Sequence, residues 1–268
     1  MIIVKLGGSV FSDKNGEPEN FRESVVRSIA GEIGEFYPDE DFIVVHGGGS
    51  FGHPYAREYG IREGLLGLSG SASFWRKKGF SLTHHAMLRA SMKIVEAFLA
   101  EGLPAVSVSS SSVFLMDKDR VVYGDVEPIR KLVETGFIPV LFGDVAVDLW
   151  KGVDILSGDQ IVTYLTKLFR PRKVIFLMSV DGIYDGKPGE GTLLFEIPAD
   201  GIDSLIKRLE QEAKSSGEGD VTGGIINKLR EAKEIARFSE VWFVNGLVPG
   251  RLRGAIRGDG FGTRIPKS

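Results

Sequence analysis

The sequence contains no cysteine among its 268 residues. Disulfide bonds, cysteine nucleophiles and thiolate metal sites are therefore excluded. It also lacks a strong charge of one sign, since 33 Lys and Arg stand against 36 Asp and Glu for a net charge of -3. We therefore expect neither nucleic acid nor a membrane surface as a partner.

A long apolar run is missing too, so no segment reaches the length that spans a membrane. The first residues lead directly into a strand-like run over 2–5, so we expect no signal peptide and a cytoplasmic location. Hydrophobic residues make up 43% of the chain, enough for a substantial core. The length suits one large domain or two lobes.

Strand-like and helix-like runs alternate along the chain, which predicts an α/β fold with a mostly parallel sheet covered by helices. We expect two lobes on one continuous sheet. The predicted strands are 2–5, 42–45, 104–108, 138–142, 145–148, 152–156, 173–178 and 241–244. The predicted helices are 20–36, 79–101, 125–136, 159–169, 200–213, 220–237 and 249–256.

Three glycines, Gly47 to Gly49, follow the apolar run over 42–45. Without side chains, their N–H groups can converge on an anion, and the helix that follows adds its positive N-terminus. A second glycine turn, Gly7-Gly8, follows the strand over 2–5 and lies next to Lys5. Two such phosphate-binding loops predict two phosphorylated ligands that face each other.

Two common nucleotide motifs fit this sequence poorly. It has no GxxxxGK[ST] segment, so a P-loop kinase is excluded. Gly47, Gly49 and Gly52 do match GxGxxG, but a dinucleotide site needs an acidic residue about 20 positions later, at the end of a strand. The segment 68–72 provides neither, which disfavours the dinucleotide interpretation. Phosphoryl transfer needs mainly positioning and charge neutralisation, which glycine loops and lysines supply.

Taken together, the motifs resemble the amino acid kinase superfamily, and within it the isopentenyl phosphate kinases, over essentially the whole chain. The motifs that carry the resemblance are Lys5 to Ser9, Ser12 to Lys14, His46 to His53, Tyr123 to Asp125, Gly143 to Val145, Ser157 to Asp159, Val180 to Tyr184, Asp220 to Gly224 and Asn245-Gly246. His53 narrows the choice, because a histidine there is typical of isopentenyl phosphate and fosfomycin kinases.

The resemblance implies a three-layer αβα sandwich with a mostly parallel central sheet. It implies an N-terminal lobe over 1–156 that binds the acceptor, isopentenyl phosphate, and a C-terminal lobe over 157–268 that binds ATP. Mg²⁺ would bridge the ATP phosphates, and no metal site made by the protein alone is expected. The resemblance also implies a homodimer.

Individual roles follow from the same resemblance. The expected catalytic residues are Lys5, Lys14, His53, Asp159 and Lys228. The expected ATP-binding residues are Lys5, Gly7, Gly8, Ser9, Gly49, Asp181, Gly223 and Lys228. The expected substrate-binding residues are Gly48, His53, Gly158, Phe80, Thr83, Met87, Val145 and Ile155.

Several residues also have a purely structural interpretation. Ser157 and Asp159 can cap the helix over 159–169. His46, at the end of a buried strand, favours a structural role. The adjacent His84 and His85 favour the protein surface, and Asp144 favours a structural or solvated role. Two further functions stay open: a kinase of another small phosphate or phosphonate such as fosfomycin, and a non-catalytic nucleotide-binding sensor.

Overall fold

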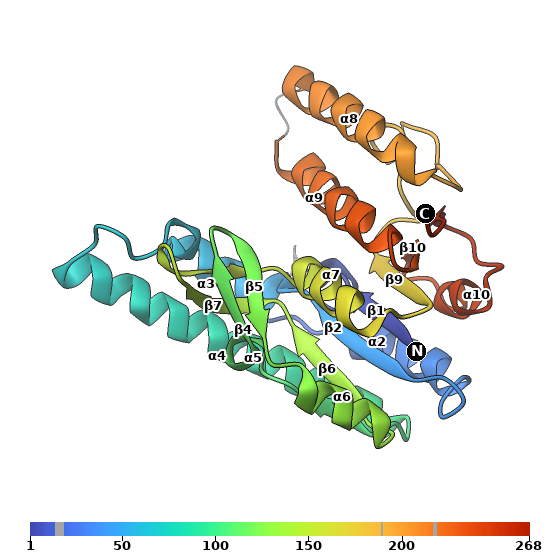
Figure 1. Cartoon of the computed structure of the whole chain (residues 1–268), viewed down its shortest axis with the longest axis horizontal. Helices are drawn as coiled ribbons and strands as arrows, with labels where there is room; N and C mark the ends of the chain where they lie inside the picture. Colours follow the sequence, from blue (N-terminus) through green and yellow to red (C-terminus); the bar gives the residue numbers. More distant parts are fainter. Residues whose placement is uncertain (14–18, 189, 217–218) are drawn as a thin grey trace.

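The computed structural model describes residues 1–13, 19–188, 190–216 and 219–268. It is an α/β fold in which helices cover both faces of a central sheet, so the predicted three-layer arrangement is confirmed (Figure 1). The division into lobes at residue 156 stays a prediction.

The central sheet has seven strands in the order β11-β10-β9-β1-β2-β6-β3. Neighbouring strands are parallel except at the β10–β11 edge, as the alternation of strands and helices predicts. In chain order the strands are β1 (Ile2–Leu6), β2 (Phe42–His46), β3 (Ala105–Ser107), β6 (Ile138–Phe142), β9 (Lys173–Met178), β10 (Glu240–Asn245) and β11 (Thr263–Ile265).

Side chains along the central strands alternate between two hydrophobic cores because successive residues of a strand face opposite sides. Ile2 and Val4 of β1 join one core, whereas Ile3 joins the other. Both faces of β1, β2 and β9 are therefore buried, which explains why these strands read as continuous apolar runs.

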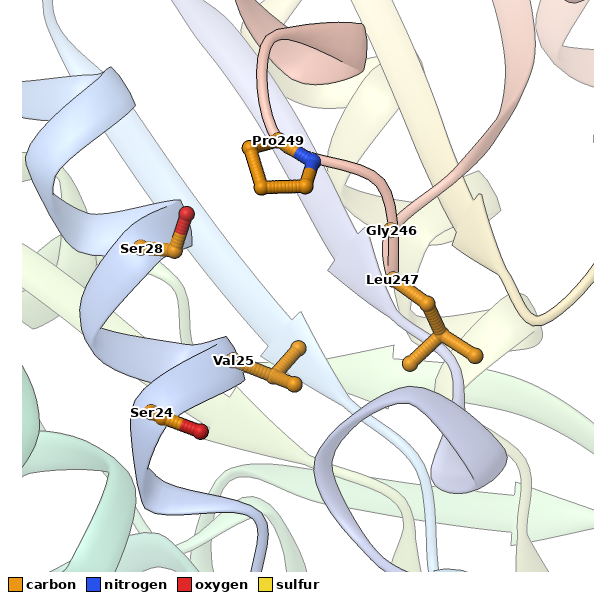
Figure 2. A pocket seen from close by; sticks show the side chains of 6 residues that line it. All are labelled: Ser24, Val25, Ser28, Gly246, Leu247 and Pro249. Carbon is orange, nitrogen blue, oxygen red and sulfur yellow. The ribbon is translucent and has the colours of Figure 1, made fainter.

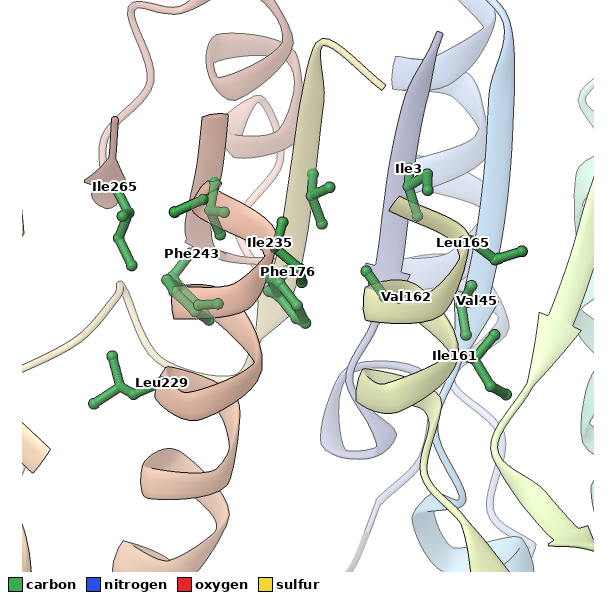
Figure 3. Packing of buried hydrophobic residues seen from close by; sticks show 14 of the residues in the cluster. Ile3, Val45, Ile161, Val162, Leu165, Phe176, Leu229, Ile235, Phe243 and Ile265 are labelled. Atoms are coloured by element: carbon green, nitrogen blue, oxygen red, sulfur yellow. The ribbon is translucent and has the colours of Figure 1, made fainter. Parts of the chain in front are cut away.

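Each face of the sheet has its own set of helices. One core contains residues of α6 (Glu127–Glu134), α7 (Gly158–Phe169), α8 (Ile202–Ser216) and α9 (Gly219–Ala236). The other contains residues of α1 (Gly8–Phe11), α2 (Glu23–Gly34), α3 (Gly49–Glu58), α4 (Gly70–Ala100) and α10 (Arg251–Arg257). Figure 3 shows α7 and α9 on the same face, packed over Ile3, Val45, Phe176 and Phe243.

Four strands form a separate sheet in the order β5-β4-β7-β8, so the prediction of one continuous sheet is wrong for this part of the chain. They are β4 (Phe114–Asp117), β5 (Arg120–Gly124), β7 (Asp144–Asp148) and β8 (Gly152–Leu156). The predicted hairpin over 145–156 is confirmed as β7 and β8. β7 follows β6 after only Gly143 and belongs to the second sheet, a change of direction that periodicity does not reveal.

Helix α4 begins nine residues before the predicted start at 79. Most of the segment 70–78 is exposed, so it lacks the apolar periodicity from which a helix is predicted. The shorter elements α5 (Ser110–Val113), η1 (Ile61–Glu63) and η2 (Ala199–Gly201) complete the described fold. Within the described ranges, no helix is long and apolar enough to cross a membrane.

Candidate active site

The glycine loops lie side by side at the carboxyl ends of the central strands. Gly7 N donates to Leu177 O at 2.9 Å, and Gly47 N donates to Leu6 O at 3.0 Å. Gly143 N donates to His46 O at 2.8 Å. Each loop therefore extends the hydrogen-bond ladder of the sheet by one residue before it turns away. Open α/β sheets bind ligands at the carboxyl ends of their strands.

The two predicted phosphate loops touch each other. A Cβ on Gly8 would lie 2.5 Å from Gly49 N, so only glycine permits this approach. Gly49 also has φ +53, which disfavours other residues. Ser12 joins the loops, because its hydroxyl donates to Gly8 O at 2.7 Å and accepts from Ser50 N at 2.9 Å. The loops are thus held face to face.

Three charged side chains from distant segments meet beside these loops. Lys5 Nζ lies 2.9 Å from Asp159 Oδ1, an ionic contact that is not aligned as a hydrogen bond. Lys228 Nζ donates to Asp159 Oδ2 at 2.6 Å. We call Lys5, Asp159 and Lys228 the charged centre. A Cβ on Gly47 would lie 3.5 Å from Lys5 Nζ, so the lysine reaches the triple-glycine loop.

Burial and charge act against each other in the charged centre. Burial lowers the pKa of Lys5 to about 8, although the Asp159 charge opposes this shift. Burial alone would raise the pKa of Asp159, but the charges of Lys228 and Lys5 outweigh it and hold that pKa well below its usual range. Asp159 therefore stays ionised, and the centre carries one net positive charge while both lysines are protonated.

Local structure explains why Asp159 is available for the lysines. Ser157 is the N-cap of α7, and its hydroxyl accepts from Asp159 N at 3.2 Å. Of the two predicted caps, Ser157 is therefore confirmed and Asp159 is wrong. Its carboxylate lies in the first helical turn, where the helix dipole also stabilises a negative charge.

His53 lies beside the triple-glycine loop, and Gly158 lies beside Lys5. His53 is exposed in the first half of α3, and a Cβ on Gly48 would lie 2.8 Å from its Cδ2 and 3.0 Å from its Nε2. Gly158 begins α7, and a Cβ there would lie 3.1 Å from His46 O and 3.5 Å from Lys5 Cε. The fold brings all of these residues to one region.

The five residues predicted to contact an apolar tail fall into two adjoining groups. Phe80, Val145 and Ile155 belong to one hydrophobic cluster with Tyr59, Ala56, Ile61, Tyr55 and Leu82, which we call the apolar cluster. Thr83 and Met87 are buried, and a Cβ on Gly52 would meet Met87 Sδ at 2.6 Å and Thr83 Cγ2 at 3.9 Å. Both therefore pack against the residue that precedes His53.

Asp181 and Ser9 belong to the segments that follow β9 and β1. Asp181 follows β9 and accepts a hydrogen bond from Asn245 Nδ2 at 3.0 Å. Ser179 Oγ lies 3.4 Å from Ser9 Oγ, which links this loop to α1. Lys14 lies outside the described residues, and for Gly223 the structure describes only its place in α9.

Two histidines have structural partners. His46 is fully buried between the rings of Phe11 and Phe142, and burial lowers its pKa to about 4, so it is neutral. His84 does not lie freely at the surface as predicted, because its Nδ1 lies 2.8 Å from Asp144 Oδ2, and this hydrogen bond raises the pKa of His84. Asp144, predicted as structural or solvated, is buried.

Ser12 belongs to a predicted motif, but no role in the site was predicted for it. The partners of Glu231 were not predicted either. Glu231 accepts from Thr163 and Arg120 and lies three residues after Lys228. The spacing of Thr163, four residues after Asp159, was the available signal, because i, i+3 and i, i+4 residues share a helix face.

Two further features of the described part of the chain are the side chains that could bind a metal and a cavity outside the predicted site. Among the residues with described positions, no group of three or more His, Cys, Asp or Glu is arranged to hold a metal. A cavity of about 250 Å³ lies between α2 and the segment after β10 (Figure 2). It is lined by Ser24, Val25, Ser28, Gly246, Leu247 and Pro249, none of which was predicted as a site residue.

Comparisons with known proteins agree with this geometry. The chain is 35% identical to an isopentenyl phosphate kinase of Methanothermobacter thermautotrophicus, over 99% of this chain and 98% of that one. It is 34% identical to an isopentenyl phosphate kinase of Arabidopsis thaliana, over 84% and 72%. A crystal structure of isopentenyl phosphate kinase matches with a TM-score of 0.79 and 32% identity, over 98% and 99% of the two chains.

A more distant structure shows how far the fold extends. Carbamate kinase from Giardia lamblia matches with a TM-score of 0.67 at 16% identity, a likeness of fold alone. The model of the amino acid kinase family matches residues 1–245, which include both glycine loops and the charged centre. This chain therefore belongs to the amino acid kinase family.

Proposed function

We propose that the protein transfers the γ-phosphoryl group of ATP to isopentenyl phosphate and forms isopentenyl diphosphate and ADP. The observation that carries the proposal is the contact of Gly8 with Gly49 beside the charged centre. Two anion-binding loops in contact bring two phosphates within reacting distance, and the lysines neutralise the charge that builds up between them. The relatives named above support the choice of acceptor.

The proposed chemistry needs no strong general base. An oxygen of the acceptor phosphate, already anionic, attacks the γ-phosphorus of ATP. A new P–O bond forms, the bond between the γ-phosphorus and the β,γ-bridging oxygen breaks, and ADP leaves with that oxygen. Lys5 and Lys228 stabilise the charge on the transferred group, and Asp159 holds their ammonium groups in place.

The other predicted residues divide between the two substrates. The ATP phosphates are bound by Gly7, Gly8, Ser9 and Gly49, with Lys14 as a further cation. The nucleotide is contacted by Asp181 and Gly223. Gly48, Gly158 and His53 hold the acceptor phosphate. We propose that Phe80, Thr83, Met87, Val145 and Ile155 contact the prenyl tail. Bound with ATP, Mg²⁺ would neutralise its phosphate charge.

The substrate assignment is tested by acceptor-dependent formation of ADP. We expect turnover with isopentenyl phosphate and much slower turnover with fosfomycin, glutamate or N-acetylglutamate. His53→Ala should lower kcat/KM for the acceptor about a hundredfold, because it removes a hydrogen-bond donor from the acceptor phosphate. His85→Ala is the matched control, since His85 is an exposed histidine on α4. Faster turnover of fosfomycin than of any prenyl phosphate would replace the proposed acceptor, and equal kinetics of both variants would remove His53 from the site.

We also propose a homodimer. Sedimentation of the purified chain near twice its monomer mass of 29.2 kDa would support it, and sedimentation as a monomer at assay concentration would exclude it.

A further inference from the structure

Helix α9 carries a second buried charge next to the charged centre. Glu231 is 6% exposed, and its Oε2 accepts from the Thr163 hydroxyl at 2.6 Å. Thr163 lies one turn after Asp159 on α7, and Glu231 lies one turn after Lys228 on α9. The same two helices are therefore joined twice, once by Lys228–Asp159 and once by Glu231–Thr163.

A third partner reaches Glu231 from the second sheet. Arg120 begins β5, and its Nη1 donates to Glu231 Oε1 at 2.5 Å. The turn before it is fastened to α7 as well, because Gln160 Nε2 donates to Asp119 O at 2.8 Å. The second sheet also contains β7 and β8, which carry Val145 and Ile155. Glu231 thus connects α9 to both α7 and the sheet that carries part of the apolar cluster.

Because Glu231 is buried, its hydrogen bonds favour one placement of α9 against α7. A buried carboxylate is costly unless its oxygens are satisfied. Here Oε1 accepts from Arg120 Nη1 at 2.5 Å, and Oε2 accepts from the Thr163 hydroxyl at 2.6 Å and from Arg120 Nη2 at 3.5 Å. Thr163 also lies 3.2 Å from Asp159 O, but the shorter contact goes to Glu231. Any slide or rotation of α9 along α7 would separate these groups. The position of the Lys228 ammonium relative to Asp159 depends on the placement of α9 as well, because Lys228 belongs to that helix.

We propose that Glu231 is a positioning residue that holds Lys228 against Asp159 through its bonds to Thr163 and Arg120. The inference rests on the proposed function insofar as Lys228 contacts the transferred phosphoryl group. A misplacement of about 1 Å at such a site can cost about a hundredfold in rate. Loss of Glu231 should therefore lower kcat more than it changes the KM of the acceptor.

The kinetic test is a double-mutant cycle of Glu231→Gln with Lys228→Met. We expect Glu231→Gln alone to lower kcat at least about tenfold, with the acceptor KM within about twofold, and to have no further effect in the Lys228→Met background. The matched control is Glu234→Gln, because Glu234 also joins α9 to α7, through the exposed Lys167 at 3.7 Å, and should leave kcat unchanged. An equal loss of kcat in both backgrounds would overturn the proposal.

A milder substitution guards against loss of folding. Thr163→Val removes the hydroxyl but keeps the Glu231–Arg120 pair, and it should repeat the kcat effect in weaker form. Thr163→Ser restores the hydroxyl and should restore kcat. If Thr163→Ser is as slow as Thr163→Val, the hydrogen bond to Glu231 does not position Lys228.

A second measurement needs no turnover and so separates this proposal from the proposed function. The ¹³Cε signal of Lys228, assigned through its loss in Lys228→Arg, reports the surroundings of the ammonium group. Glu231→Gln should shift or broaden this signal, whereas Glu234→Gln should not. An unchanged signal in Glu231→Gln would overturn the positioning role even if isopentenyl phosphate proves not to be the acceptor.

Discussion

The charged centre and the apolar cluster are held together by different kinds of interaction. The charged centre joins three distant segments through ion pairs of 2.6 and 2.9 Å, in which the Asp159 carboxylate offsets the charges of Lys5 and Lys228. The apolar cluster joins α3, η1, α4, β7 and β8 through apolar packing. Volume-conserving changes in such a cluster cost little, whereas one lost charge in a buried pair costs much. We therefore expect the charged centre to set the reaction type and the apolar cluster to set the choice of acceptor.

The largest effect should follow from Asp159→Asn. It leaves Lys5 and Lys228 without their shared anion, so we expect kcat to fall about a thousandfold. The free energy of unfolding should fall by about 3 kcal/mol, because a buried ion pair loses one partner. Steady-state kinetics and urea unfolding measure both, with Asp203→Asn as control, since Asp203 pairs with Lys233 at an exposed site. A variant with more than a tenth of the original kcat would contradict the role of the charged centre.

The next largest effect should follow from Gly8→Ala. The added Cβ would meet the backbone of Gly49 and push the two glycine loops apart, so we expect kcat/KM to fall about a hundredfold. Gly31→Ala is the control, because a Cβ there meets only Glu101 Oε2 at 4.0 Å and α2 should gain up to about 1 kcal/mol of stability. Similar kinetics of the two variants would mean that loop contact does not matter for transfer.

The pH dependence should reveal Lys5. We expect transfer to need the charged form of Lys5. Because burial lowers the pKa of Lys5 to about 8, kcat/KM for ATP should fall about tenfold per pH unit above that value. Lys5→Arg should lack this decline because arginine stays charged. From Lys5 alone, the free energy of unfolding should rise between pH 8 and 10.5, since the unfolded chain binds more protons there. A flat profile in the unmodified protein would contradict the assignment.

The smallest effect should follow from Phe80→Ala in the apolar cluster. We expect the acceptor KM to rise about threefold to tenfold through lost apolar contact, with kcat and the KM of ATP nearly unchanged. Met92→Ala on the same helix is the control, because Met92 is 58% exposed. If kcat fell as strongly as the acceptor KM rose, the apolar cluster would affect the reaction rate as well as acceptor binding, which contradicts the expected division of roles.

Local pattern predicted much of the fold and the identity of many candidate residues. The central strands were predictable because both of their faces are buried, and the glycine loops because they follow those strands. The exposed start of α4 and the move of β7 to a second sheet were not, since neither leaves a periodic signal. The partners of Glu231 and of His84 were missed because they lie 60 or more residues away along the chain.

The most direct test of phosphoryl transfer to isopentenyl phosphate follows the phosphoryl group itself. The purified protein is incubated with γ-³²P-labelled ATP and isopentenyl phosphate, and the label is located after separation of the products. We expect label in isopentenyl diphosphate, in amounts equal to the ADP formed, and about a thousandfold less label with Asp159→Asn. Label that remains in ATP or appears only as inorganic phosphate, with isopentenyl phosphate unchanged, would contradict it.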